Sequence, residues 1–374
     1  MERLGVRAQT LYAYVSRGRV RAQSDPVDPR RSRYRAGDVA TLVQRKQRGR
    51  KQADVAQGAI SWGEPVLDSA ITTVEGGRLY YRGRDAVQLA DTDSLESVAR
   101  LLRGGHGAAL KRADRQLPPP DLDMHARTFA ALAARAAADP PSRGRAPLVL
   151  AIEATSLLDG LADAVAGAAT NGAIHERLAR AWGCEPAGAD LIRRALVLLA
   201  DHELNASTFC ARVAASTGAS LSACALAGLS ALSGPLHGGM AARVEAFAAE
   251  VERSGAQQAV AARLAQGAPI PGFGHQLYPE GDVRAMALLR VFEPPPAYQA
   301  MLAATQAATG EKANIDFALT AMARALKLPD GAPFALFAVA RCAGWIAHAM
   351  EQVSTGALIR PRARYMGPLP SPVV

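Results

Sequence analysis

The sequence predicts a mainly α-helical protein with a helical body and a small, basic N-terminal segment. Alanine is abundant, whereas aromatic residues make up only 5% of the chain, and this composition favours helices over strands. From about residue 147 onward, apolar residues recur at helical spacing between short breaks. The net charge of +9 lies at one end, because residues 1–54 carry 14 Lys/Arg and five Asp/Glu while the rest of the chain carries 29 of each. A basic module therefore precedes a neutral body.

The basic module, residues 1–54, has the pattern of a small DNA-binding fold. Residues 4–20 (LGVRAQTLYAYVSRGRV) predict a turn and a short helix, with Leu11 and Val15 facing a core. A strand, a Pro/Asp turn, a second strand and a helix from about Gly37 are expected to follow. The segment resembles the winged helix-turn-helix of the MerR and excisionase type, which implies a helix in the major groove and wing arginines on phosphates. In that family a full helix precedes the LGV motif, so a basic, partly ordered extension remains an alternative.

If the module binds DNA, its polar helix face and its wing are expected to make the contacts. The residues concerned are Arg7, Gln9, Thr10, Tyr12, Arg17, Arg30, Arg31, Arg33 and Arg35. Residues 45–58 contain few apolar side chains and predict a linker to the body.

The body is expected to begin with a hairpin that turns at Gly76 and Gly77 and leads into a helix. Residues 101–147 contain several Gly- and Pro-rich breaks, and within them one alanine-rich helix is predicted at Met124–Ala138. Successive helices follow, and residues 333–350 are the most apolar of them. Because Arg341 and His348 interrupt that segment, we do not expect it to span a membrane.

The cysteines indicate a reducing compartment. They form no CxxC pair and occur in apolar helical patterns at Cys184, Cys210, Cys224 and Cys342. Reduced core cysteines and the lack of an apolar signal region at the N-terminus predict a cytoplasmic protein.

Polar motifs interrupt the apolar body at four places. They are DHELNAST (201–208), SGPLHGGM with His237, the loop PGFGHQLYPEGDVR (271–284) with His275 and Arg284, and NIDF with Asp316 in the first turn of a helix. Taken singly, each has an ordinary structural explanation, such as Asn314 acting as an N-cap. Arg341 on an apolar helix needs a partner. No HExxH motif is present, and no metal site is predicted.

In this order and spacing, the motifs resemble those of the citrate synthase family. The resemblance also includes YYRGRDAVQLA (80–90), RCAGWIAH (341–348) and LIRPRARYMG (358–367), and runs from about residue 60 to the end. It implies a two-domain helical body in which the small domain closes over the substrates. The large domain is expected at 55–235 and 335–374, and the small one at 236–334.

The resemblance implies condensation of acetyl-CoA with oxaloacetate, followed by thioester hydrolysis. No permanently bound cofactor is expected, because the CoA thioester is a co-substrate. Asp316 is implied as the base, His237 as the donor to the thioester oxygen, and His275 as the residue that polarises the ketone.

The remaining site residues are implied to bind the two substrates. Those for the carboxylates and carbonyl of oxaloacetate are His202, Arg284, Arg341 and Arg360. Those for CoA are Gly272, Phe273, Gly274 and Asn314. The family is homodimeric, and Arg360 is implied to reach the partner's site.

Several points stay open. Gln276 and Pro279 occupy positions where many bacterial members carry basic residues, so the CoA contacts are not fixed by the resemblance. Propionyl-CoA could replace acetyl-CoA, which would give 2-methylcitrate, and a DNA-binding regulator that senses citrate or CoA with little turnover is the alternative from another class. A helix N-terminus lowers the pKa of a carboxylate such as Asp316 whereas burial raises it.

Overall fold

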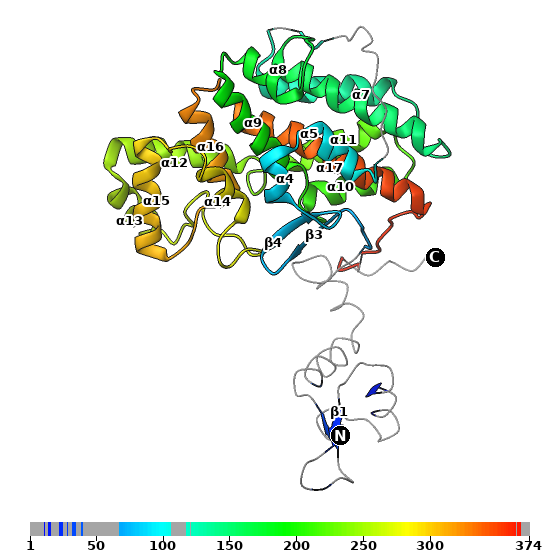
Figure 1. The fold of residues 1–374 in the computed structure, drawn as a ribbon, viewed down its shortest axis with the longest axis horizontal. Coiled ribbons are helices and arrows are strands. Elements are labelled where there is room, and N and C mark those ends of the chain that lie inside the picture. The colour runs from blue at the N-terminus through cyan, green and yellow to red at the C-terminus, as the bar shows by residue number, and fades with distance from the viewer. Residues whose placement is uncertain are drawn as a thin grey trace, which may run out of the picture. The chain divides into compact units, whose positions relative to one another are not determined.

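In the computed structural model, the chain divides into two compact units, Met1–Asp68 and Ser69–Val374. The structure describes residues 67–105, 117–119, 121–363 and 365–367, together with residues 11, 14, 15, 22–24, 28, 32–34 and 39. Figure 1 shows the ribbon, with the helices of the second unit labelled in chain order.

The first unit contains a short antiparallel strand pair, as expected. Strand β1 (Ala22–Ser24) pairs with β2 (Ser32–Tyr34), and Ala22 lies opposite Tyr34. Leu11 is buried as expected, and Val15 is among the partly buried side chains that pack against it. For Arg33, which lies in β2, the side chain is not described. The other residues expected to face DNA, and the expected linker at 45–58, lie outside the described residues.

The second unit is mainly helical, and it begins with a three-stranded antiparallel sheet in the order β3-β4-β5. The expected hairpin is confirmed, with Gly76 (φ 59°) and Gly77 (φ 74°) in the left-handed conformation that its turn requires. The strands and helices of this unit are β3 (Thr72–Glu75), β4 (Arg78–Tyr81), β5 (Arg84–Asp85), α4 (Ala86–Thr92), α5 (Leu95–Leu102), α6 (Met124–Ala138), α7 (Pro147–Ala166), α8 (Ile174–Ala181), α9 (Pro186–Leu199), α10 (Ala206–Ser216), α11 (Leu221–Leu232), α12 (Met240–Ser254), α13 (Ala256–Ala265), α14 (Val283–Leu289), α15 (Pro296–Thr309), α16 (Ile315–Ala325) and α17 (Ala332–Thr355).

Two details differ from the sequence-based expectation. Helix α14 begins at Val283, so Arg284 lies in its first turn and the expected loop 271–284 ends two residues early. The reason is local, because the Asp282 side chain caps this helix by accepting the Arg284 N–H. All four cysteines are free, but Cys184 lies between α8 and α9 and not in a helix. The helix predicted at Met124–Ala138 is confirmed as α6.

Helix α17 is the central helix of the core. Of the helices described, it is also the one long and apolar enough to cross a membrane, but 89% of its most apolar window is buried inside the protein. Arg341 and His348 on this helix are 1% and 0% exposed. Because buried polar and charged groups need partners, these two side chains are expected to contact the segments packed against α17.

Two hydrophobic cores lie within the second unit, and α16 contributes to both. Ile315 and Leu319 join the larger core, which surrounds α17, whereas Phe317 and Ala321 join a smaller core formed mainly by α12, α13 and α15. Figure 1 shows α12, α13 and α15 grouped at one end of this unit. Asp316 therefore sits on the helix that connects the two cores.

Helix α11 packs so closely on α17 that position 228 leaves no room for a side chain. A Cβ at this position would lie 2.6 Å from the Trp345 ring. Gly228→Ala is therefore expected to destabilise the fold. Overpacking costs about 1–3 kcal/mol, whereas the gain in helix propensity is at most roughly 1 kcal/mol. Urea unfolding measures the change. Ser230→Ala, on the exposed face of the same helix, is the control and should shift stability by less than about 0.5 kcal/mol; equal stability of the two variants would contradict the packing.

Candidate active site

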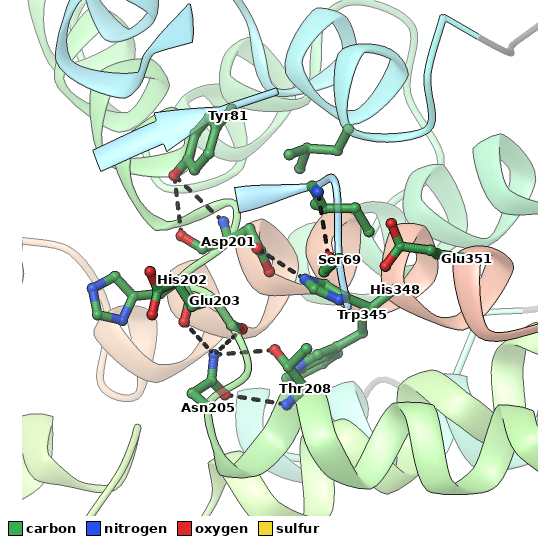
Figure 2. A network of polar contacts seen from close by, with 12 residues as sticks. Ser69, Tyr81, Asp201, His202, Glu203, Asn205, Thr208, Trp345, His348 and Glu351 are labelled. Carbon is green, nitrogen blue, oxygen red and sulfur yellow. Dashed lines mark hydrogen bonds and ion pairs between the residues drawn. The ribbon is translucent and has the colours of Figure 1, made fainter. Parts of the chain in front are cut away.

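His202 is held by a turn between α9 and α10. Figure 2 shows this turn with Asn205, which caps α10 through its side-chain oxygen. Glu203 has a φ of 52°, and its carboxylate accepts the Val74 N–H at 2.6 Å, which ties the turn to β3. The His202 Nε2 atom lies 2.9 Å from the Tyr278 hydroxyl. Burial, together with nearby cationic groups, holds the pKa of His202 well below its usual value, so the ring is neutral.

His237 lies in the turn between α11 and α12, and Ser207 holds its ring in place. The His237 Nε2 atom is 2.8 Å from Ser207 Oγ, and Ser207 Oγ accepts the Trp345 indole N–H at 3.1 Å. The Ser207 hydroxyl donates to Asn205 Oδ1 at 2.7 Å, because an amide oxygen can only accept. Ser207 therefore connects His237 to the cap of α10 and to Trp345.

Burial is the main cause that lowers the pKa of His237 to about 3, and Arg341 and Arg284 add to it. The ring is thus a neutral donor at any physiological pH. It also packs edge-on against Phe337, with ring centroids 5.9 Å apart.

His275 lies in the loop before α14, and its tautomer follows from one backbone contact. Its Nδ1 atom accepts the Leu277 N–H at 3.1 Å, so the neutral ring carries its proton on Nε2. Burial and Arg284 lower the pKa of His275 to about 4. The ring lies 5.2 Å from His202 and 4.9 Å from Tyr278, measured between centroids.

The expected CoA loop pairs with the segment that begins α16. Gly274 N–H donates to Lys312 O at 2.9 Å and Asn314 N–H donates to Gly272 O at 2.8 Å, so Phe273 faces Ala313 in an antiparallel bridge. At Gly272, where φ is 84°, a Cβ would meet Phe317 at 3.0 Å, which explains the glycine.

Asp316 follows Asn314, which caps α16 by accepting the Asp316 N–H at 3.1 Å. The Oδ1 atom of Asp316 is buried and has no hydrogen-bond partner in the described part of the chain. Burial raises the pKa of Asp316 to about 7, although Arg284 and Arg341 act in the opposite direction. Burial therefore prevails over the helix N-terminus, the question that the sequence left open.

The two arginines expected to bind oxaloacetate differ in how they are held. Arg284 forms a two-pronged ion pair with Asp282, at 2.9 Å through Nε and 2.8 Å through Nη2. Asp282 also accepts the Ile315 N–H at 3.0 Å and so joins α14 to α16. Arg341 donates through Nε to Leu199 O at 3.0 Å, and its Nη2 atom is buried without a partner among the described residues.

These side chains come together from five segments of the chain, although no hydrogen bond found in the described part joins any two of His237, His275 and Asp316. Arg284 and Arg341 each influence the pKa of His237 and of Asp316. The geometry gives two neutral histidine donors, a carboxyl group that titrates near neutrality, and an arginine N–H without a partner. Arg360 does not join them in the single chain, where it is exposed on the segment after α17.

Four residues of the site received no role from the sequence. Tyr278 contacts His202 and lies under the Arg284 guanidinium, whose carbon is 5.4 Å from the ring centre. Asp282 holds Arg284, whereas Ser207 contacts His237 and accepts the Trp345 indole N–H. Asp282 precedes a helix start and could have been found as an N-cap, but the others depend on contacts between distant segments.

The described ranges contain no group of three or more His, Cys, Asp or Glu side chains placed to hold a metal ion.

Comparison with known proteins gives consistent results. Residues 124–362 match the family model described as the citrate synthase C-terminal domain. The chain is 34% identical over 334 residues to "Putative citrate synthase 2" of Mycobacterium tuberculosis, covering 79% of this chain and 88% of that protein. It is 36% identical over 195 residues to the 2-methylcitrate synthase of the same species, covering 49% of each.

Two solved citrate synthase structures have a similar fold. Citrate synthase from Thermotoga maritima superposes with a TM-score of 0.64 at 26% identity, covering 83% of this chain and 96% of that one. The ternary complex of citrate synthase from Thermoplasma acidophilum with carboxymethyl coenzyme A and oxaloacetate gives 0.67 at 25% identity, with the same coverage.

Proposed function

Because the chain belongs to the citrate synthase family, we propose that it condenses an acyl-CoA thioester with oxaloacetate and hydrolyses the resulting thioester. The observation that carries this proposal is the Asp316 carboxyl group, whose buried Oδ1 has no partner among the described residues and whose pKa is raised to about 7. A group of this kind is suited to remove a weakly acidic proton at neutral pH.

The first step is proton removal from the carbon beside the thioester. Asp316 takes this proton, and the negative charge moves to the thioester oxygen as an enolate. The neutral ring of His237 donates an N–H to that oxygen without losing its own proton. A fixed donor in a buried site stabilises developing charge more than water does.

The second step forms the carbon–carbon bond. The enolate carbon attacks the ketone carbon of oxaloacetate, and the Nε2–H of His275 polarises the ketone and then gives its proton to the new alkoxide. Water next cleaves the thioester, which releases CoA and the tricarboxylic acid. The overall reaction consumes one water and releases one proton. The proton that Asp316 took replaces the one that His275 gave, so both groups return to their starting states.

Oxaloacetate is held through its two carboxylates. Arg341 offers the unpartnered Nη2, and Arg284 keeps donor groups beyond the two bound to Asp282, since a guanidinium has five N–H groups. His202 lies beside His275 and is a neutral contact. The Thermoplasma acidophilum relative binds oxaloacetate together with a CoA analogue, which supports one site for both substrates here.

The acyl group is proposed to be acetyl, with propionyl as the second candidate because a 2-methylcitrate synthase is among the relatives. One methylene changes selectivity by only about 1–3 kcal/mol. We assign CoA to the paired segment of Gly272, Phe273, Gly274 and Asn314, whose backbone is fixed by its hydrogen bonds to residues 312–314.

Three further parts of the proposal concern organisation. The large domain comprises 55–235 and 335–374, and the small one 236–334, with closure between them; the two hydrophobic cores support this division. The chain forms a homodimer in which the exposed Arg360 serves the partner's site. Residues 1–54 form a winged helix-turn-helix that binds DNA, supported by their charge and by the strand pair.

Measuring thiol release by the purified chain tests the proposed reaction. Acetyl-CoA with oxaloacetate should release CoA, and neither substrate alone should do so. A higher kcat/KM with propionyl-CoA would assign the 2-methylcitrate reaction instead. Lack of turnover with both thioesters, combined with tight citrate binding and salt-sensitive DNA binding, would contradict the proposed enzyme activity. It would indicate the DNA-binding regulator instead.

A further inference from the structure

A buried polar network lies behind His202 and takes no part in the steps above. Its centre is the contact of His348 Nε2 with Asp201 Oδ2 at 3.1 Å, and both residues are fully buried. Figure 2 shows this contact directly beside the turn that carries His202. On its other side, His348 Nδ1 lies 3.2 Å from Arg212 Nη1, which also meets Glu351 at 2.6 Å.

The protonation of the pair follows from Arg212. A guanidinium only donates, so Nδ1 of His348 accepts and the ring proton sits on Nε2, facing Asp201. Burial acts to raise the pKa of Asp201, but His348 and Arg341 outweigh it, so the pKa is lowered and the group is a carboxylate. The network thus has one stable arrangement of donors and acceptors.

One face of helix α17 forms three contacts with the turn and with the end of α9. Arg341 Nε donates to Leu199 O at 3.0 Å, Gly344 N–H donates to Ala200 O at 3.1 Å, and His348 Nε2 reaches the Asp201 side chain. Positions 341, 344 and 348 are three and four residues apart, so they follow one line along the helix. A Cβ at Gly344 would collide with the Asp201 carboxylate.

The opposite side of the turn is held by the hairpin. The fully buried Tyr81 hydroxyl lies 3.2 Å from Asp201 O and 3.0 Å from Val197 O at the end of α9. The turn is therefore fixed between the hairpin and α17, and His202 is the next residue along the chain. Arg341, which donates to Leu199 O, also has a buried Nη2 without a partner among the described residues.

We propose that Asp201 and His348 are positioning residues, whose buried contact fixes the turn so that His202 and Arg341 meet the same oxaloacetate molecule. The inference rests on the proposed function, because it assigns the pair to binding of this substrate. If the pair contributed only to stability, its removal would not change the KM for oxaloacetate more than the KM for acyl-CoA.

Kinetics of two His348 variants test the proposal against a remote control. His348→Leu removes the donor to Asp201 and should raise the KM for oxaloacetate about ten- to hundred-fold, since small misplacements have effects of this size, while the KM for acyl-CoA stays within about two-fold. His348→Gln should restore most of the affinity, because its amide can donate to Asp201 and accept from Arg212. Asp163→Asn breaks an equally buried ion pair with Arg177 on α7 and α8, and should lower the Tm without changing either KM.

A readout without substrate separates this proposal from the proposed function. In protein labelled with ¹⁵N-histidine, the wild type should show His348 as the Nε2–H tautomer, assigned by loss of its signal in His348→Gln. Asp201→Asn should shift the signals of both His348 and His202, and Asp163→Asn should shift neither. This result is expected even if thiol release is absent, an outcome that would count against the reaction alone.

Two results would overturn the positioning role. One is an unchanged His202 signal in Asp201→Asn. The other, in an active enzyme, is a His348→Leu variant that loses stability, as the control does, but keeps its KM for oxaloacetate.

Discussion

Asp316→Asn is expected to lower kcat by about 10²–10⁴-fold, the usual contribution of a positioned general base. The asparagine has nearly the same shape but cannot take the proton from the acyl group. Oxaloacetate binding, measured by calorimetry without acyl-CoA, should change little because the site arginines stay in place. A variant with more than a tenth of the wild-type turnover would refute the assignment of the base.

The pH profile provides an independent check on Asp316. Because the base must be ionised and its pKa is raised to about 7 by burial, the wild-type rate should fall as the pH drops through about 7. His275 and His237 have pKa values lowered to about 4 and 3, so they cannot cause this acid limb. The limb should be absent from the residual activity of the variant.

The same substitution should not cost stability at alkaline pH. A carboxyl whose folded-state pKa is raised contributes stability that is present below its ordinary pKa of 3.8 and lost as the pH rises through about 7. Ionised Asp316 thus costs the fold roughly a few kcal/mol. Asp316→Asn should therefore unfold at an equal or higher temperature at pH 8, which excludes misfolding as the reason for lost activity.

Arg341→Leu is expected to raise the KM for oxaloacetate by about two orders of magnitude, because removing one partner of a buried charge pair costs 2–5 kcal/mol or more. Burial lowers the pKa of Arg341 only to about 10, so the wild-type side chain is charged at neutral pH and its Nη2 is available. Oxaloacetate should raise the Tm of the wild type and not that of the variant.

Arg177→Lys is the matched control for Arg341, since Arg177 is equally buried at 1% exposed and forms ion pairs with Asp159 and Asp163. It should destabilise the fold without changing the KM for oxaloacetate. A similar KM in Arg341→Leu and in the control would assign oxaloacetate binding to other residues.

The sequence determined the helical body, the hairpin at Gly76-Gly77 and the segments on which polar residues interrupt the apolar pattern. These features are local: helical periodicity, turn glycines and caps are set by residues a few positions apart. The resemblance of the motifs also predicted the family. What each candidate residue does during turnover stays a prediction that the variants above test.

The tertiary structure alone decided the chemical state of those residues. That Asp316 titrates near 7 depends on burial between two cores, and the sequence contained equal arguments for the opposite shift. The hydrogen bonds beside His237 involve Ser207 and Trp345, which lie 138 residues apart in the chain. The contact of His348 with Asp201 joins residues 147 positions apart. Burial, protonation and hydrogen-bond partners depend on which distant segments meet, and no local pattern in the sequence contains that information.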